Sequence, residues 1–211
     1  MSSYDTCFFE RYAHVTLKEC LGPEYDDLVN RDRPDLQSSD GLTMGIEVTR
    51  AIEESKKAAE ELLDNMAGVS EMPCDDMDVE QLLLSGYGYG LNVGRMVSPK
   101  ENLYWSMALP MKRILESKVS KMISGLYGMY RKTGLYVFSK DALSDSDIIG
   151  ACNLVLELQR CQALRYDFLY LSEVNVLNVC NLRDDVADTY RVASFPISME
   201  MRRRFFVEAL G

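Results

Sequence analysis

The segment DRPDLQSSDGLTMGIEVTRAI, residues 32–52, decides the fold because it contains two short strand-like runs separated by a turn. The runs at 34–37 and 44–51 predict β-strands, since apolar residues alternate with polar ones between turn-forming residues. Between them, the dipeptide Asp40–Gly41 is a strong signal for the tight turn of a β-hairpin. We therefore expect an antiparallel hairpin at this point of the chain.

Alternation along the second strand divides its side chains between two faces: Met44, Ile46 and Val48 on one, and Gly45, Glu47 and Thr49 on the other. The hairpin would bring Asp35 beside Glu47. Two carboxylates that share a site repel each other unless a cation lies between them, and hard oxygen ligands suit Mg²⁺ or Mn²⁺. Such a cation could lower the pKa of a bound water, which could then attack a phosphodiester. Because Gly45 has no side chain, it would leave room for the metal and the phosphate.

The composition limits the alternatives. With 211 residues, 47% of them hydrophobic, the chain can bury the core of one domain, which we expect to span 1–211. A single histidine, His14, excludes zinc sites of the HExxH type, and its helical surroundings favour a structural role. Scattered cysteines predict reduced thiols, and short apolar runs predict a soluble, cytoplasmic protein without membrane contact.

Charge is distributed unevenly along the chain. Residues 51–82 contain ten acids and two lysines, whereas residues 100–140 contain eight basic residues and two acids among several aromatic residues. The basic segment could hold a phosphate backbone, with Lys112, Arg113 and Lys121 as contacts and aromatic rings available for base stacking. The alternative is a solvated helix face whose aromatic residues belong to the core.

The remaining periodicity predicts alternating helices and strands. Helices are expected at 5–21, 52–66, 105–131, 147–163 and 198–209, and further strands at 135–139, 166–172 and 176–182. A less regular insertion at about 69–103 lies between them. Strands separated by long helices indicate an α/β (α+β) class with layered architecture.

Pro34–Asp35 followed by Glu47–Val48–Thr49, after a helix that carries acids, resembles the PD-(D/E)XK nucleases of the restriction-endonuclease-like superfamily. The resemblance covers mainly residues 5–50, with a looser match through LYVFS at 135–139. It implies a core of order αβββαβ, in which a mixed central sheet lies between helices in three layers. It also implies Mg²⁺-dependent hydrolysis of the phosphodiester bonds of nucleic acid, most often DNA.

The resemblance assigns roles to individual residues. Asp35 and Glu47 would bind the metal, and the backbone carbonyl of Val48 would complete the ligand set. A glutamate of the opening helix often joins such sites, and here Glu19 lies nearer the Pro-Asp segment. Glu10, nine residues earlier, remains an alternative. Nucleases that cut both strands often pair their sites, so the resemblance is compatible with a homodimer.

The chain departs from the family pattern at Thr49, where the family usually has a lysine that orients the attacking water. Some members move this lysine to the following helix. On a helical wheel, an apolar stripe forms from Leu115, Val119, Met122 and Leu126. Lys118 lies at its border and Lys121 further out, so Lys118 is preferred as the catalytic lysine.

Two other functions fit the same sequence. A catalytically inactive member of the fold would bind nucleic acid or protein without turnover, because Thr49 replaces the lysine. A soluble α/β interaction protein would instead use its acidic and basic segments to pair with each other or with a partner protein.

Overall fold

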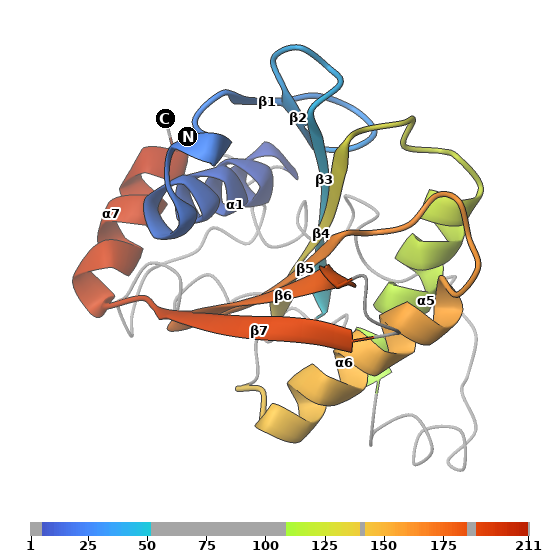
Figure 1. Cartoon of the computed structure of the whole chain (residues 1–211). Helices are drawn as coiled ribbons and strands as arrows, with labels where there is room; N and C mark the ends of the chain where they lie inside the picture. The colour runs from blue at the N-terminus through green and yellow to red at the C-terminus, as the bar shows by residue number, and fades with distance from the viewer. Residues whose placement is uncertain (1–5, 52–108, 140–141, 185–188, 211) are drawn as a thin grey trace, which may run out of the picture.

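A computed structural model describes residues 6–51, 109–139, 142–184 and 189–210 (Figure 1). The elements follow in the order α1 (Thr6–Leu21), the short 3₁₀ helix η1 (Pro23–Tyr25), β1 (Leu28–Asn30), β2 (Leu36–Ser38), β3 (Met44–Ala51), α5 (Leu109–Ile123), β4 (Lys132–Ser139), α6 (Asp145–Leu158), β5 (Phe168–Glu173), β6 (Val176–Asp184), β7 (Thr189–Pro196) and α7 (Met199–Leu210).

The described strands form one mixed sheet of seven, ordered β1 to β7 as they occur in the chain. β1, β2 and β3 pair antiparallel, β3, β4 and β5 pair parallel, and β5, β6 and β7 pair antiparallel. Parallel neighbours need a crossover connection, and α6 lies in the connection between β4 and β5. The predicted α/β class with a mixed sheet is confirmed.

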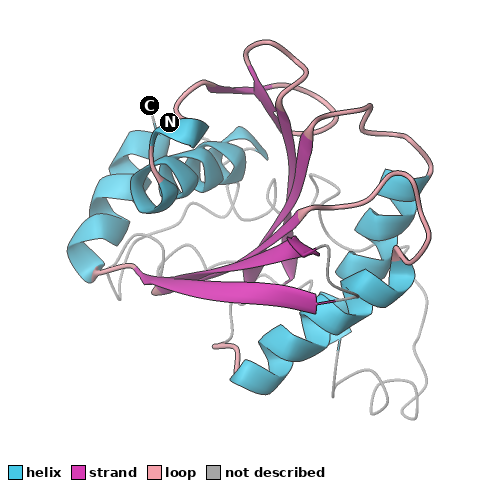
Figure 2. Cartoon of the chain, viewed as in Figure 1, coloured by secondary structure: helices cyan, strands magenta, loops and turns pink. Residues whose placement is uncertain are grey.

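Helices cover both faces of the sheet, so the described part of the molecule has three layers (Figure 2). On one face, α1 and α7 pack over a core that includes Phe8, Ile46 and Phe205. On the other face, α5 and α6 pack over a second core that includes Leu115 and Val155. Since β3 contributes to both cores, its two rows of side chains are both buried.

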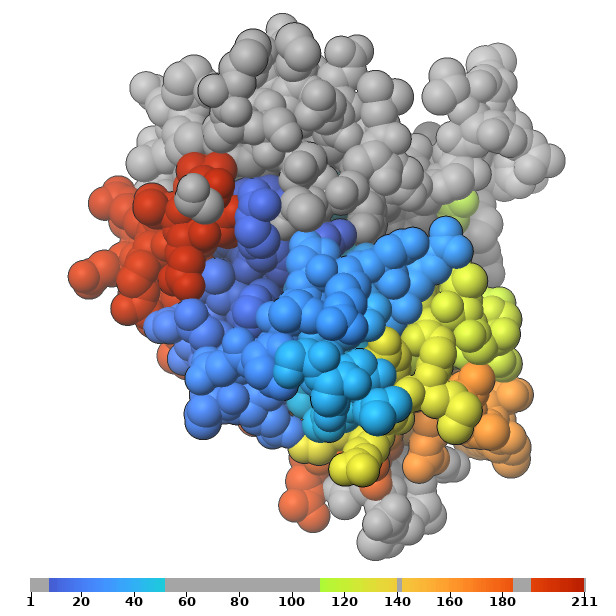
Figure 3. Space-filling view, turned by 90° about the horizontal axis from the view of Figure 1, so that it is seen from above, coloured from blue at the N-terminus to red at the C-terminus, as the bar shows by residue number. Residues whose placement is uncertain are grey.

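The hairpin between β2 and β3 is held at its turn by Asp40 and by the segment that enters β4. The Asp40 carboxylate accepts hydrogen bonds from the backbone N–H groups of Leu42 and Thr43, at 2.8 and 2.9 Å. Backbone N–H groups of Arg131 and Lys132 donate to the carbonyls of Leu42 and Thr43. The turn therefore lies against the start of β4, as the cyan and yellow surfaces show in Figure 3.

Most predicted elements occur within a few residues of their expected bounds, with two differences. The sequence reading missed β1 and β7, which are the two edge strands of the sheet. α5 is shorter than the helix expected at 105–131, because the chain leaves the helix before Gly125, whose φ is +78°. The helix expected at 52–66 and the insertion expected at 69–103 lie outside the described residues.

Among the described helices, none has both the length and the apolar character needed to cross a membrane.

Candidate active site

Asp35, directly before β2, and Glu47, within β3, lie side by side. The pairs Leu36↔Ile46 and Gln37↔Gly45 set the antiparallel register, and continuing it by one residue places Asp35 opposite Glu47. Both side chains are buried, with 7% and 6% of their surface exposed. The expected division of β3 is also found, since Met44, Ile46 and Val48 belong to the core under α1 and α7.

The Asp35 carboxylate accepts the backbone hydrogen bond that Val48 would otherwise donate to a neighbouring strand. Its Oδ2 atom accepts a hydrogen bond of 2.7 Å from the Val48 backbone N–H. The N–H and C=O of one strand residue point toward the same neighbouring strand, so the Val48 carbonyl lies on the side of Asp35. Upstream, the Gln37 side-chain amide donates to the Pro34 carbonyl at 2.9 Å and fixes the segment that carries Asp35.

Lys118 reaches this pair from α5. Its Nζ atom lies 2.5 Å from Oε1 of Glu47, and the residue is 7% exposed. The neighbouring candidate, Lys121, is exposed. The structure thus brings Lys118 to the carboxylates and leaves Lys121 at the surface, as the helical wheel indicated.

One member of the expected apolar stripe of α5 is placed differently. Leu115, Val119 and Met122 are buried, whereas Leu126 is 43% exposed. α5 ends at Ile123, so Leu126 no longer follows the helical periodicity that would have buried it.

Glu10, rather than Glu19, belongs to the carboxylate cluster. Glu10 is 6% exposed, and its negative charge contributes to raising the pKa of Asp35. Glu19 is exposed and forms an ion pair with Arg204 of α7. The assignment of Glu19 to the site is therefore corrected. Nine residues correspond to about two and a half helical turns, which puts Glu10 and Glu19 on opposite sides of α1.

The cluster is electrostatically suited to a cation. Burial first, and then the charge of Glu47, raise the pKa of Asp35 to about 8, while the Val48 N–H, through its hydrogen bond, and the Lys118 charge act in the opposite direction. A cation between Asp35 and Glu47 would remove the repulsion between them. Oxygen donors of this type suit Mg²⁺ or Mn²⁺, which retain water ligands alongside one or two carboxylates.

The number of protein ligands is small. Among the described residues, no group of three or more His, Cys, Asp or Glu side chains is arranged to hold a metal ion. A cation here would therefore depend on Asp35, Glu47, the Val48 carbonyl and water. That donor set fits a hydrated Mg²⁺ and would not fit a zinc ion, which prefers four nitrogen or sulfur ligands.

Two buried hydroxyl groups complete the surroundings of Glu47. Thr49 is 1% exposed, and its Oγ1 atom has no hydrogen-bond partner among the described residues. Tyr127 was not expected in the site, because its place in the basic segment suggested base stacking. It is instead buried, and its hydroxyl lies close enough to Glu47 for the carboxylate to add to the pKa increase that burial causes. No pattern in the sequence around Tyr127 indicates this position.

Gly45 does not provide open space for a metal and a phosphate. A Cβ atom built on Gly45 would lie 2.6 Å from Cδ2 of Tyr130. The ring of Tyr130 therefore occupies the space that the missing side chain leaves, and the expectation for Gly45 is corrected.

The proposed phosphate contacts all lie on α5, but the aromatic part of the basic segment has another role. Lys112 is paired with Glu116 at 3.9 Å, in an i,i+4 arrangement, and Arg113 is half-buried. Tyr136 and Phe138 are fully buried core residues, so they are not available for base stacking. Tyr104 and Trp105 lie outside the described residues.

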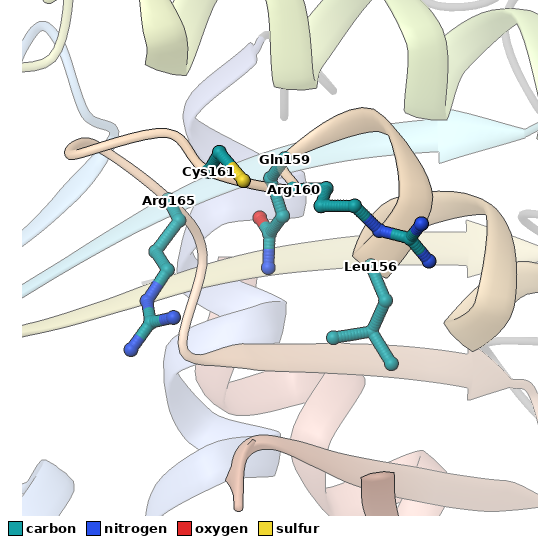
Figure 4. A pocket seen from close by; sticks show the side chains of 5 residues that line it. All are labelled: Leu156, Gln159, Arg160, Cys161 and Arg165. Carbon is teal, nitrogen blue, oxygen red and sulfur yellow. The ribbon is translucent and has the colours of Figure 1, made fainter. Parts of the chain in front are cut away.

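A separate hollow of about 350 Å³ lies at the end of α6 (Figure 4). It is lined by Leu156, Gln159, Arg160, Cys161 and Arg165. The Gln159 amide both donates to the carbonyl and accepts from the N–H of Tyr166, at 3.0 and 2.9 Å, and so fixes the loop before β5. Arg160 is placed where its positive charge opposes the negative end of the helix dipole. None of these residues belongs to the carboxylate cluster.

Comparison of the chain with protein-family models, with curated proteins and with solved structures gives no match.

Proposed function

We propose that the protein is a metal-dependent nuclease of the PD-(D/E)XK type, which hydrolyses phosphodiester bonds of nucleic acid, with DNA as the proposed substrate. The observation that carries the proposal is the convergence of Asp35, Glu47 and Lys118. These residues come from three separate segments, yet all are buried together, and Lys118 Nζ lies 2.5 Å from Glu47 Oε1. Burying charged groups costs free energy even when they are paired, and clusters of this kind occur preferentially at functional sites.

The order of elements supports the same proposal. The described chain begins with α1, continues through the antiparallel strands β1, β2 and β3, and after α5 adds β4 parallel to β3. This is the αβββαβ order implied by the resemblance. Asp35 directly precedes the second strand and Glu47 lies within the third, which supports the roles as metal ligands that the resemblance implies.

The chain's own residues would divide the chemistry between them. Asp35, Glu47 and the Val48 carbonyl would hold Mg²⁺ or Mn²⁺. When bound, the metal supplies a water of lowered pKa and polarises a phosphoryl oxygen. Lys118 would take the role of the lysine that the family usually has at position 49. It would donate a hydrogen bond to the attacking water and stabilise the negative charge that develops on the phosphoryl oxygens. Glu10 would orient water on the α1 side.

Nucleic acid would reach the site along α5. Lys112, Arg113 and Lys121 lie on the same helix as Lys118 and could contact the phosphate backbone. A homodimer would bring two such sites to opposite strands of a duplex, which is the arrangement that double-strand cleavage needs. Both the partner and the dimer belong to this proposal.

The test is cleavage of a supercoiled plasmid and of labelled DNA and RNA oligonucleotides in Mg²⁺, Mn²⁺ or EDTA. Wild type should cut in the presence of metal, whereas Asp35→Ala and Glu47→Ala should lose at least about 100-fold in rate. Glu10→Gln and Glu19→Gln form a matched pair on α1, and only Glu10→Gln should reduce the rate. Equal cleavage by wild type, Asp35→Ala and Glu47→Ala would contradict the proposal.

The second candidate is a catalytically inactive nucleic-acid-binding or protein-interaction member of this fold. The observation that favours it is Thr49, which occupies the position of the usual lysine and is buried. This candidate predicts a gel shift with DNA that weakens as salt is raised, without any cleavage in Mg²⁺ or Mn²⁺.

A further inference from the structure

Tyr127 is held rigidly beside the carboxylate cluster. It follows α5 in a turn that contains Gly125 and Gly128, both with positive φ, and it is 3% exposed. Its ring centroid lies 6.5 Å from that of Tyr166, whose hydroxyl donates to the Lys118 carbonyl at 3.3 Å. The two rings therefore form a wall behind the helix turn that carries Lys118.

The Tyr127 hydroxyl is both buried and without a hydrogen-bond partner among the described residues. Buried polar groups of native proteins nearly always have a partner, so an unpaired one needs an explanation. Here the hydroxyl lies beside Glu47, although no hydrogen bond of normal geometry joins them. A phenol keeps its proton at neutral pH, so the Tyr127 hydroxyl can donate.

The two groups have complementary chemistry. An ionised carboxylate only accepts hydrogen bonds and has four lone-pair positions, of which Lys118 uses one on Oε1 of Glu47. A ligating carboxylate is usually fixed by further hydrogen bonds, which orient it toward the metal. Among the described residues, Tyr127 has a buried hydroxyl beside Glu47 that could provide one.

We propose that Tyr127 is a positioning residue whose hydroxyl donates a hydrogen bond to Glu47 and holds this carboxylate in the orientation that binds a divalent cation. The inference rests on the proposed function in one respect, since it assumes that Glu47 is a metal ligand. It goes beyond that function by assigning a role to a residue that neither the motif nor the basic segment identifies.

The experiment is calorimetric titration of the full chain with Mn²⁺, which needs no nuclease activity. Tyr127→Phe removes the hydroxyl and keeps the ring. Tyr12→Phe is the matched control, because Tyr12 is also a buried tyrosine whose hydroxyl has no described partner, and it lies in the core under α1 and α7. Tyr127→Phe should weaken Mn²⁺ binding by about 10-fold or more, and Tyr12→Phe should leave it unchanged.

Thermal unfolding provides the second measurement. Without metal, both variants should still unfold in a single cooperative transition, which shows that they are folded. With Mn²⁺, the increase in melting temperature should be smaller for Tyr127→Phe than for wild type or Tyr12→Phe.

The outcomes separate the two proposals. If wild type and Tyr127→Phe bind Mn²⁺ equally, the role of Tyr127 is wrong while the metal site stands. If wild type binds no Mn²⁺, both proposals fail. If Tyr127→Phe does not fold even without metal, the hydroxyl is needed for folding and not for orienting Glu47, and the role of Tyr127 is wrong.

Discussion

Replacing Asp35 by asparagine should change the pH dependence of stability in a direction opposite to that of an ordinary acid. Asp35 is 7% exposed, and burial together with the Glu47 charge raises its pKa from 3.8 to about 8. Asparagine has nearly the same shape, and its side-chain oxygen can still accept the hydrogen bond from the Val48 N–H. The substitution therefore removes a buried carboxyl group that can become charged, and it keeps the hydrogen bond between the residue at position 35 and the Val48 N–H.

The sign follows from proton linkage. Between about pH 4 and pH 8 the folded protein binds more protons at Asp35 than the unfolded chain does, so the wild type loses stability as the pH rises through this range. The difference in pKa corresponds to an upper limit of about 6 kcal/mol. Protonated aspartic acid and asparagine are both neutral, so the two proteins should be about equally stable at pH 4. Asp35→Asn should then be more stable than wild type at pH 8.5, by at most about 6 kcal/mol.

Urea unfolding followed by circular dichroism in EDTA, at pH 4, 6 and 8.5, measures this difference. Glu19→Gln is the control, because Glu19 is exposed on α1 and lies outside the cluster, so its effect should not show this pH dependence. Addition of Mg²⁺ at pH 8.5 should stabilise wild type more than Asp35→Asn. A difference that stays constant from pH 4 to 8.5, or an asparagine variant that is less stable at pH 8.5, would refute the reasoning.

Two further substitutions test the hairpin that carries the site. Asp40→Asn should lower the melting temperature at pH 7, because the Ser38 hydroxyl and other donors lower the pKa of Asp40 and so stabilise the folded state. The loss should become smaller as the pH falls below about 4, where the unfolded chain begins to bind a proton at this acid, and thermal unfolding at pH 7, 4 and 2.5 checks this. Gly45→Ala should destabilise by about 1–3 kcal/mol, because the new methyl group would lie 2.6 Å from the Tyr130 ring, and urea unfolding should show a smaller loss in a Tyr130→Ala background.

The sequence was most informative where the structure is local. The hairpin places Asp35 opposite Glu47 through pairing of residues about ten positions apart, and strand alternation alone predicts the face on which Glu47 lies. Lys118 could be preferred over Lys121 because its position relative to an apolar stripe depends only on helical periodicity. The sequence did not predict β1 and β7. Each is an edge strand with only one neighbouring strand, and its residues show a weaker apolar pattern than those of the central strands.

Other members of the site depend on contacts that no local pattern reports. Glu10 approaches Asp35 through the packing of α1 on the sheet, and Tyr127 approaches Glu47 because a turn after α5 directs its ring inward. Their sequence neighbourhoods contain nothing that distinguishes them from surface or core residues. A search for site residues in such a chain therefore has to begin with the paired carboxylates and proceed outward through the structure.

Placing the lysine on α5 has a consequence for how the site is maintained. A lysine at position 49 would lie on the same strand as Glu47. Lys118 lies on α5, so its position relative to Glu47 depends on how α5 packs on the sheet. That packing depends on Leu115, Val119 and Met122, which are buried along the helix face adjoining Lys118. The distance between Lys118 and Glu47 therefore depends on the hydrophobic core, so the geometry of the proposed site and the stability of this layer are physically coupled.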